Sequence, residues 1–144
     1  MPEPTINDMM EAYALDAVNY VKANFGVELD FSNDSIKELE TVAGQLYDSI
    51  PRSFFSQLFK KAPGQEEIDA VCKLLGGYLG EVYRRNKPGD WGIHEEFNAI
   101  GICHEDRWLF PPTKVYKRLT NGEEDNLHSF FTVALSMPWS ANDS

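Results

Sequence analysis

The residues best suited to chemistry gather in one short segment of the chain. Between positions 94 and 106 it carries two histidines, a cysteine and four carboxylates: His94, Glu95, Glu96, Cys103, His104, Glu105 and Asp106. A cysteine nucleophile needs a base within hydrogen-bond reach and a third group that orients the base. Neighbouring residues on a strand point to opposite faces, so His104 is badly placed to activate Cys103. We therefore expect structural thiols at Cys103 and at Cys72, and no catalytic residue.

A metal site is the second chemistry that this segment could support. Metal sites in proteins recur with preorganising spacings such as CxxC or HExxH. The sequence contains neither of these, nor an HxxxH pair. We expect a solvated, charged hairpin without metal or cofactor, and we interpret His128 as a rim residue of the last helix.

Adjacent carboxylates recur at 66–67, 95–96 and 123–124. Acid–base catalysis by two carboxyl groups requires them to converge on one cleft, whereas helical neighbours diverge by about 100°. Glu81, in contrast, can form an ion pair. It can pair with Arg84 or Arg85 one turn later, or with a base of the 112–121 segment such as Lys117 or Arg118. Each interpretation gives these carboxylates a structural role.

Basic residues are concentrated in the second half of the chain. Seven of the thirteen lie between positions 84 and 118: Arg84, Arg85, Lys87, Arg107, Lys114, Lys117 and Arg118. With Trp91, Trp108 and Tyr116 nearby, such a stretch is typical of a surface for anions or nucleic acid. The chain has a net charge of −10, however, and an acidic protein repels polyanions. We expect the bases to pair with acids of the same chain, and we expect no nucleic-acid partner.

The acidic residues are concentrated in the first third. Residues 1–50 hold ten acids and two bases, a net charge of −8. Such a surface attracts cationic partners and repels anionic membranes. No apolar run approaches the roughly 18 residues of a membrane span, the first residues have neither the basic nor the apolar region of a secretory leader, so we expect none, and two distant cysteines form no disulfide framework. We therefore expect a cytoplasmic protein with no membrane partner.

The elements that position these residues begin with helices. A chain of 144 residues that is 42% hydrophobic predicts a single domain over 1–144, with frayed ends at 1–6 and 140–144. Helical spacing predicts helices over 7–24, 35–50, 52–61 and 65–86. Asn7 is the expected N-cap of the first helix, and Gly26 ends it. Ser35 and Glu38 predict a capping box for the second, with Asp34 as an alternative cap. Residues 27–31 fit an extended link or an edge strand.

The period changes after residue 90. Segments 91–97, 99–104 and 107–110 are short and rich in β-prone residues, which predicts two or three antiparallel strands with a turn at 104–106. Two prolines then predict a helix from 111 that Asn121-Gly122 ends. The acids at 123–125 suit the start of a final helix that Pro138 ends. The predicted fold class is α+β, a single helix-dominated domain with a small antiparallel sheet of two or three short strands.

The helix predicted over 65–86 is the longest, and it carries Gly76, Gly77 and Gly80 in its interior. Each glycine costs about 1 kcal/mol relative to alanine there. Close approach by another element would offset this cost, because a glycine has no Cβ. Gly76 and Gly80 lie on one edge of the apolar arc and Gly77 points roughly away from it. We expect the 112–121 or the 123–136 helix to pack on the Gly76/Gly80 edge.

Three segments together are similar to a known group of proteins. They are LLGGYLGEVYRRN (74–86), the Trp91-Gly92 pair and FPPTKVYKRLTNGEEDNL (110–127). This pattern resembles a group of small bacterial domains of unknown function, in which an L-G-x-Y-L-G-E helix precedes a tryptophan-bearing strand and a P-x-x-K-V-x-K-R-L-x-N-G-E-E-D segment. LDFSNDSI (29–36) also resembles the entry segment of that group. The resemblance implies a small α+β domain, and it implies no activity and no catalytic residues.

Two functional hypotheses follow. The first is a non-catalytic cytoplasmic protein-binding module, in its sharpest form an immunity- or antitoxin-like inhibitor of a cationic partner. Its acidic face would consist of Asp8, Glu11, Asp16, Asp34, Glu38 and Glu40, although these acids could also serve only as solvated surface. The second is an enzyme or small-ligand domain with a site between the 91–110 hairpin and the 112–121 helix. That site would use Arg85, Trp91, His104, Trp108 and Lys117.

Overall fold

The computed structural model of the chain describes residues 3–50 and 65–137. Its elements are α1 (Ile6–Phe25), α2 (Ser35–Ser49), α4 (Gln65–Arg84), β1 (Asp90–His94), β2 (Ala99–His104), β3 (Arg107–Leu109), α5 (Pro111–Asn121), a 3-10 turn η2 (Glu123–Asp125) and α6 (Leu127–Ser136). The predicted helix-dominated α+β fold with a small antiparallel sheet is confirmed. The helix expected over 52–61 lies outside the described residues.

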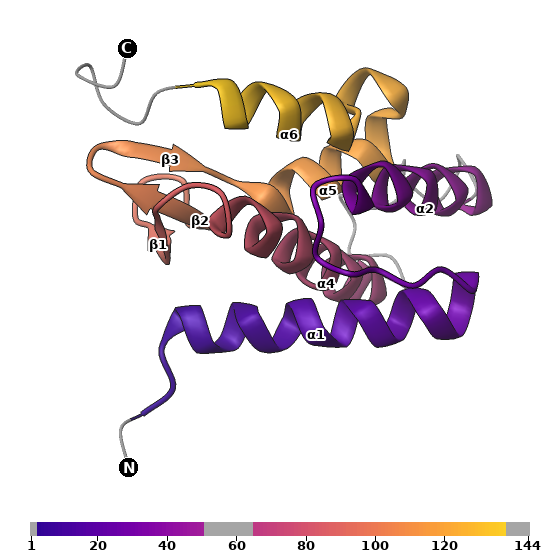
Figure 1. The fold of residues 1–144 in the computed structure, drawn as a ribbon, viewed down its shortest axis with the longest axis horizontal. Coiled ribbons are helices and arrows are strands. Elements are labelled where there is room, and N and C mark those ends of the chain that lie inside the picture. Colours follow the sequence, from indigo (N-terminus) through magenta and orange to yellow (C-terminus); the bar gives the residue numbers. More distant parts are fainter. Residues whose placement is uncertain (1–2, 51–64, 138–144) are drawn as a thin grey trace.

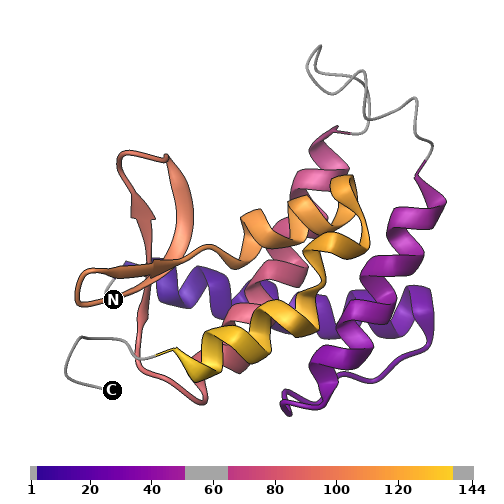
Figure 2. The same ribbon diagram turned by 90° about the horizontal axis from the view of Figure 1, so that it is seen from above.

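Helix α4 occupies the centre of the molecule (Figure 1). One of its sides packs on α1 and another on α5, and α2 and α6 pack against each other and against α5. The sheet lies beside one end of α4, as the view from above shows (Figure 2). Leu75, Tyr78, Leu79 and Val82 of α4 are almost completely buried and form the middle of the core.

The N-cap of the first helix lies two residues earlier than predicted. Thr5, not Asn7, is the N-cap of α1, and it forms a complete capping box with Asp8. The Asp8 amide donates to Thr5 Oγ1 (3.1 Å), and the Thr5 amide donates to Asp8 Oδ2 (2.9 Å). A reciprocal box satisfies two unpaired amides, whereas a single asparagine cap satisfies one. The end is as predicted: Gly26 has a φ of 69°, and its amide donates to the Lys22 carbonyl.

The predicted capping box of α2 is wrong. Ser35 is buried, and its hydroxyl contacts the Ser32 carbonyl and the Tyr78 hydroxyl at 2.6 Å each, instead of capping the helix with Glu38. Asp34 occupies the cap position without a side-chain hydrogen bond. The segment before it is a link and not a strand, because Phe31 adopts a φ of 63° and its amide donates to the Tyr78 hydroxyl (2.8 Å). Tyr78 therefore fixes the entry to α2.

Proline begins α5 at residue 111, and Gly122 follows its last residue, as predicted. The final helix begins later than predicted. Residues 123–125 form the turn η2, and Asn126 caps α6 by accepting a hydrogen bond from the Ser129 amide (2.9 Å). The acids at 123–125 do not start the helix, because the Asp125 carboxylate turns to Lys114 Nζ (2.8 Å) and to the Asn121 amide group (3.0 Å). These two hydrogen bonds hold the pKa of Asp125 below its usual value.

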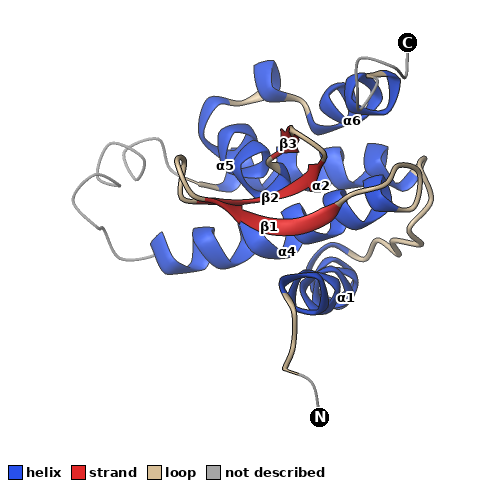
Figure 3. Ribbon diagram, turned by 90° about the vertical axis from the view of Figure 1, so that its left-hand side faces the viewer, coloured by secondary structure: helices blue, strands red, loops and turns tan. Residues whose placement is uncertain are grey.

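The three strands form an antiparallel sheet in the order β1-β2-β3, drawn in red in Figure 3. Trp91 is opposite Ile102, and Ile102 is opposite Leu109, so these side chains share the face that packs on the helices. The other face carries Gly92, Gly101, Cys103 and Trp108. We call it the outer face. The β2–β3 turn lies at 104–107, close to the prediction, with Glu105 at a φ of 57°.

The three glycines of α4 are approached by three different elements. A Cβ at Gly76 would lie 2.5 Å from Pro112 Cα of α5, and one at Gly80 would lie 2.2 Å from the Trp91 ring of β1. One at Gly77 would lie 3.2 Å from the Met10 carbonyl of α1. The predicted contact of α5 with Gly76 is confirmed. At Gly80 the neighbour is a strand, not a helix, and Gly77 faces α1 at close range.

We expect Gly76→Ala to lower the free energy of unfolding by about 1–3 kcal/mol, because the added methyl group meets the backbone of Pro112. Urea unfolding measures the change. Lys73→Ala, at an exposed position one turn earlier in α4, is the control and should stay within about 0.5 kcal/mol. A Gly76→Ala protein that is stabilised by about 1 kcal/mol, as helix propensity alone predicts, would contradict the close contact.

Candidate functional site

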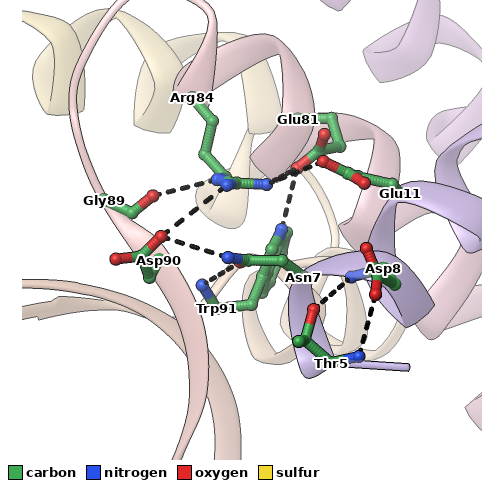
Figure 4. Close-up of polar contacts among 9 residues, drawn as sticks. All are labelled: Thr5, Asn7, Asp8, Glu11, Glu81, Arg84, Gly89, Asp90 and Trp91. Atoms are coloured by element: carbon green, nitrogen blue, oxygen red, sulfur yellow. Dashed lines mark hydrogen bonds and ion pairs between the residues drawn. The ribbon is translucent and has the colours of Figure 1, made fainter. Parts of the chain in front are cut away.

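A partly buried polar network joins α1, α4 and β1 (Figure 4). At its centre, Glu81 Oε2 accepts hydrogen bonds from Arg84 Nη1 and from Trp91 Nε1, each 2.8 Å long. Arg84 Nε donates to the Gly89 carbonyl (2.9 Å) and thereby holds the turn between α4 and β1. The predicted pairing of Glu81 with Arg84 is confirmed. Arg85 has a different contact, with its guanidinium 4.0 Å above the ring of Phe31.

Asn7 connects this network to the free edge of the sheet. Its side-chain oxygen accepts from the Trp91 amide (2.7 Å), and its side-chain nitrogen donates to Asp90 Oδ1 (3.1 Å). An unpaired edge amide is a template for association with another strand. The asparagine satisfies one such amide of β1 from within the chain. All these groups are used in holding elements together, so the network is structural.

A second ion pair lies on the other side of α4. Arg118 of α5 is only 3% exposed, and its Nη2 contacts Glu40 Oε2 of α2 at 2.8 Å. Arg118 Nε also donates to both carboxylate oxygens of Glu40 (2.9 and 3.0 Å). Glu40 Oε1 accepts from the Leu127 amide at the start of α6 (2.8 Å). One carboxylate therefore joins α2, α5 and α6. Pairing of the basic stretch with acids of the chain is confirmed for Arg84, Lys114 and Arg118.

We expect Glu40→Ala to lower the free energy of unfolding by about 3 kcal/mol, because it leaves the buried Arg118 guanidinium without its counter-charge. Glu38→Ala removes the same charge from an exposed position two residues earlier in α2, and should stay within about 0.5 kcal/mol. Urea unfolding of the two variants separates the positions. Equal effects would contradict the structural role of Glu40.

Three of the six acids of the predicted acidic face are engaged within the chain. Asp8 caps α1, Glu11 lies 3.6 Å from Arg84, and Glu40 pairs with Arg118. The other three, Asp16, Asp34 and Glu38, are exposed. The six are also divided between two layers, because α1 packs on α4 whereas α2 packs mainly on α5 and α6 (Figure 1).

The five residues of the predicted ligand site are not brought together. Trp91 is buried against α4, Trp108 lies on the opposite face of the sheet, and Arg85 covers Phe31. A hollow of about 350 Å³ does lie between β2 and α5. Its described lining contains none of the five; it consists of Asp69, Cys72, Lys73, Asn98, Ala99, Ile100, Pro112, Thr113 and Tyr116.

Neither cysteine has an activated thiol. Burial, reinforced by Asp69, raises the pKa of Cys72 to about 12. Burial also raises the pKa of Cys103, with Asp106 and Asp90 adding to the effect. The Cys103 thiol donates to the Glu105 carbonyl (3.4 Å). Within residues 3–50 and 65–137, no three His, Cys, Asp or Glu side chains are grouped so that they could hold a metal ion.

The outer face of the sheet carries a cluster of four aromatic side chains, which we call the aromatic platform: His94, Phe97, Trp108 and Phe110. Two of its rings lie over glycines of β1 and β2. The Trp108 ring is 3.5 Å from the Cβ position of Gly92, and the Phe110 ring is 2.8 Å from that of Gly101. The absence of side chains at these glycines lets the rings lie flat on the sheet.

Ring contacts hold the platform together. Trp108 and Phe110 are nearly parallel, with centroids 5.9 Å apart, and His94 and Phe97 are stacked at 4.5 Å. The edge-on contact of His94 with Trp108 (4.9 Å) joins the two pairs. The Phe97 amide donates to His94 Nδ1 (3.2 Å) and fixes the β1–β2 turn. Phe97 nevertheless remains 63% exposed.

A shallow hollow adjoins the platform at this turn. It is lined by Ile93, His94, Glu95, Glu96 and Trp108. Both glutamates are exposed, and neither forms an ion pair with any residue that the structure describes. The hollow therefore combines an indole, an imidazole and two uncompensated carboxylates.

Part of this surface is predicted from the sequence for other reasons. His94, Glu95 and Glu96 are candidate metal ligands and Trp108 is a candidate ligand contact, whereas the sequence does not point to Phe97 or Phe110. The available signal is that Trp108 and Phe110 are two residues apart, and so point to the same face, and that glycines occupy positions 92 and 101. The placement of these rings over these glycines follows from the strand register, which residue types alone do not determine.

No family model, curated protein or solved structure matches the chain. The resemblance to small bacterial domains of unknown function therefore stays a prediction. Among the described residues, no helix is long and apolar enough to cross a membrane.

Proposed function

We propose that the chain is a non-catalytic, cytoplasmic protein-binding module, and that its partner docks on the aromatic platform. The observation that carries the proposal is the exposure of Phe97, at 63%, within a cluster of four aromatic rings. Clustered exposed apolar groups mark interaction surfaces on soluble proteins. The residues that dominate binding energy at protein interfaces are enriched in tryptophan, tyrosine and arginine, and the platform contains Trp108.

The charge of the molecule supports a cationic partner. The net charge is −10, and Asp16, Asp34 and Glu38 remain exposed. Glu95 and Glu96 add negative charge directly beside the platform. A field of this sign accelerates association with a basic surface and disfavours acidic competitors. An immunity- or antitoxin-like inhibitor that covers a cationic site is the sharpest form of the proposal.

The polar groups support binding more than catalysis. Glu81, Arg84 and Arg118, which could have served in an active site, are used in contacts between elements. Both thiols have raised pKa values. The hollow between β2 and α5 supports a small-ligand site as the second candidate function, with Tyr116 and Thr113 as polar groups of its lining.

Affinity capture from a lysate of the source cells tests the proposal. We expect a specific protein to be retained by the immobilised wild-type chain and by Leu15→Ala, and to be reduced at least tenfold by Phe97→Ala. Leu15 of α1 is 60% exposed and is a matched apolar control away from the sheet. A tenfold loss corresponds to about 1.4 kcal/mol, which is typical of an important interface residue.

A third immobilised variant, Asp16→Lys with Glu38→Lys, tests the contribution of the exposed acids of α1 and α2. Retention that does not change with Phe97→Ala would move the docking site off the platform. If no protein is retained above the level of a column without the chain, the protein-binding function is wrong.

A further inference from the structure

The hollow beside the aromatic platform has an unusual combination of neighbours. One wall is the ring of Trp108 with the imidazole of His94, and the rim carries the carboxylates of Glu95 and Glu96. Elsewhere in the described residues, the carboxylate of Asp125 contacts the Lys114 ammonium group, which lies 5.8 Å from the ring of Phe130. The hollow also has acids and rings, but no lysine or arginine is among its described lining residues.

A cation against an aromatic face is attracted by the negative charge of the π system, and nearby carboxylates strengthen this attraction. The chain uses the same chemistry internally. The guanidinium of Arg85 lies 4.0 Å above the ring of Phe31, and that of Arg118 lies 5.7 Å from the ring of Tyr47 while pairing with Glu40. The Arg118 site combines a guanidinium, a carboxylate and an aromatic ring. The hollow presents carboxylates and an aromatic ring to solvent.

We propose that this hollow receives an arginine side chain of the partner, with the guanidinium on the ring of Trp108 and its N–H groups donating to Glu95 and Glu96. The inference rests on the proposed function, because it names the group of the protein partner that the platform recognises. A guanidinium is preferred over an ammonium group. It is planar, so it stacks on the indole, and it presents several N–H donors at once to two carboxylates.

The architecture suits such a receptor. Trp108 contacts both Phe110 and His94, which also contact each other, so binding does not have to order it. The two glutamates lie in a four-residue turn whose conformation is fixed by the hydrogen bond from Phe97 to His94. The ring and the turn are therefore in place before the guanidinium arrives.

Titration of the ¹⁵N-labelled full chain with N-acetyl-arginine amide, followed by NMR, tests the inference. We expect saturable shifts of the Trp108 indole N–H and of the amides of residues 94–97. N-acetyl-citrulline amide, which has a similar shape and no charge, should leave these signals in place. The lysine derivative should bind at least threefold more weakly, and raising the salt concentration should weaken the arginine response.

Matched charge variants locate the site. Glu95→Gln with Glu96→Gln should raise the Kd for the arginine probe at least fivefold. Glu123→Gln with Glu124→Gln removes an equally exposed adjacent pair at η2 and should leave the Kd unchanged. All four substitutions are at exposed positions, and the unperturbed remainder of each spectrum verifies the fold.

Equal shifts with citrulline, equal affinity for the lysine derivative, or equal effects of the two variant pairs would overturn the arginine receptor. These outcomes leave the proposed function intact, because capture that depends on Phe97 can occur with a partner that has no arginine at this point. Conversely, a failed capture with a positive arginine titration would refute the protein-binding function while leaving a guanidinium site.

Discussion

Close packing around α4 is the constraint on which the rest of the structure depends. Its three interior glycines cost roughly 2–3 kcal/mol of helix stability, and each is matched by a different neighbour. Pro112 lies against Gly76, Met10 and Tyr13 against Gly77, and Trp91 against Gly80. The helix is therefore approached closely by α5, by α1 and by β1. A side chain at any of the three positions would displace the backbone or ring that contacts it.

The contact at Gly80 also determines the outer face of the sheet. With its ring on Gly80, Trp91 places its indole N–H on Glu81, which fixes the rotation of β1 about its own axis. Because side chains alternate along a strand, Gly92 and His94 must then face outward. Pairing with β2 and β3 places Gly101 and Trp108 on the same side. The aromatic platform is thus a consequence of how the strand is held against α4.

Features that depend on local sequence could be predicted, and most features that depend on contacts between separate elements could not. The helices, the Gly26 stop, the prolines of α5 and the existence of a small sheet depend on local sequence and were predicted. The start of α6 was not predicted, and of the two caps predicted for α2 only the position of Asp34 is right, because tertiary partners compete for the capping groups. Ser35 is taken by Tyr78, 43 residues away, and Asp125 is taken by Lys114. The platform depends on strand register, which residue types alone do not determine.

The distribution of charge was informative only in part. Ten of the acids lie in residues 1–50, yet Glu40 is used to hold Arg118, and Asp8 and Glu11 are engaged near the start of α1. A carboxylate that satisfies a buried guanidinium is already neutralised locally and contributes little to the external field. What a partner encounters is the charge that remains after such pairs are removed. By that measure Glu95 and Glu96, which lie outside the acidic third, are as well placed for a partner as any acid within it, because they adjoin the aromatic platform with its exposed Phe97.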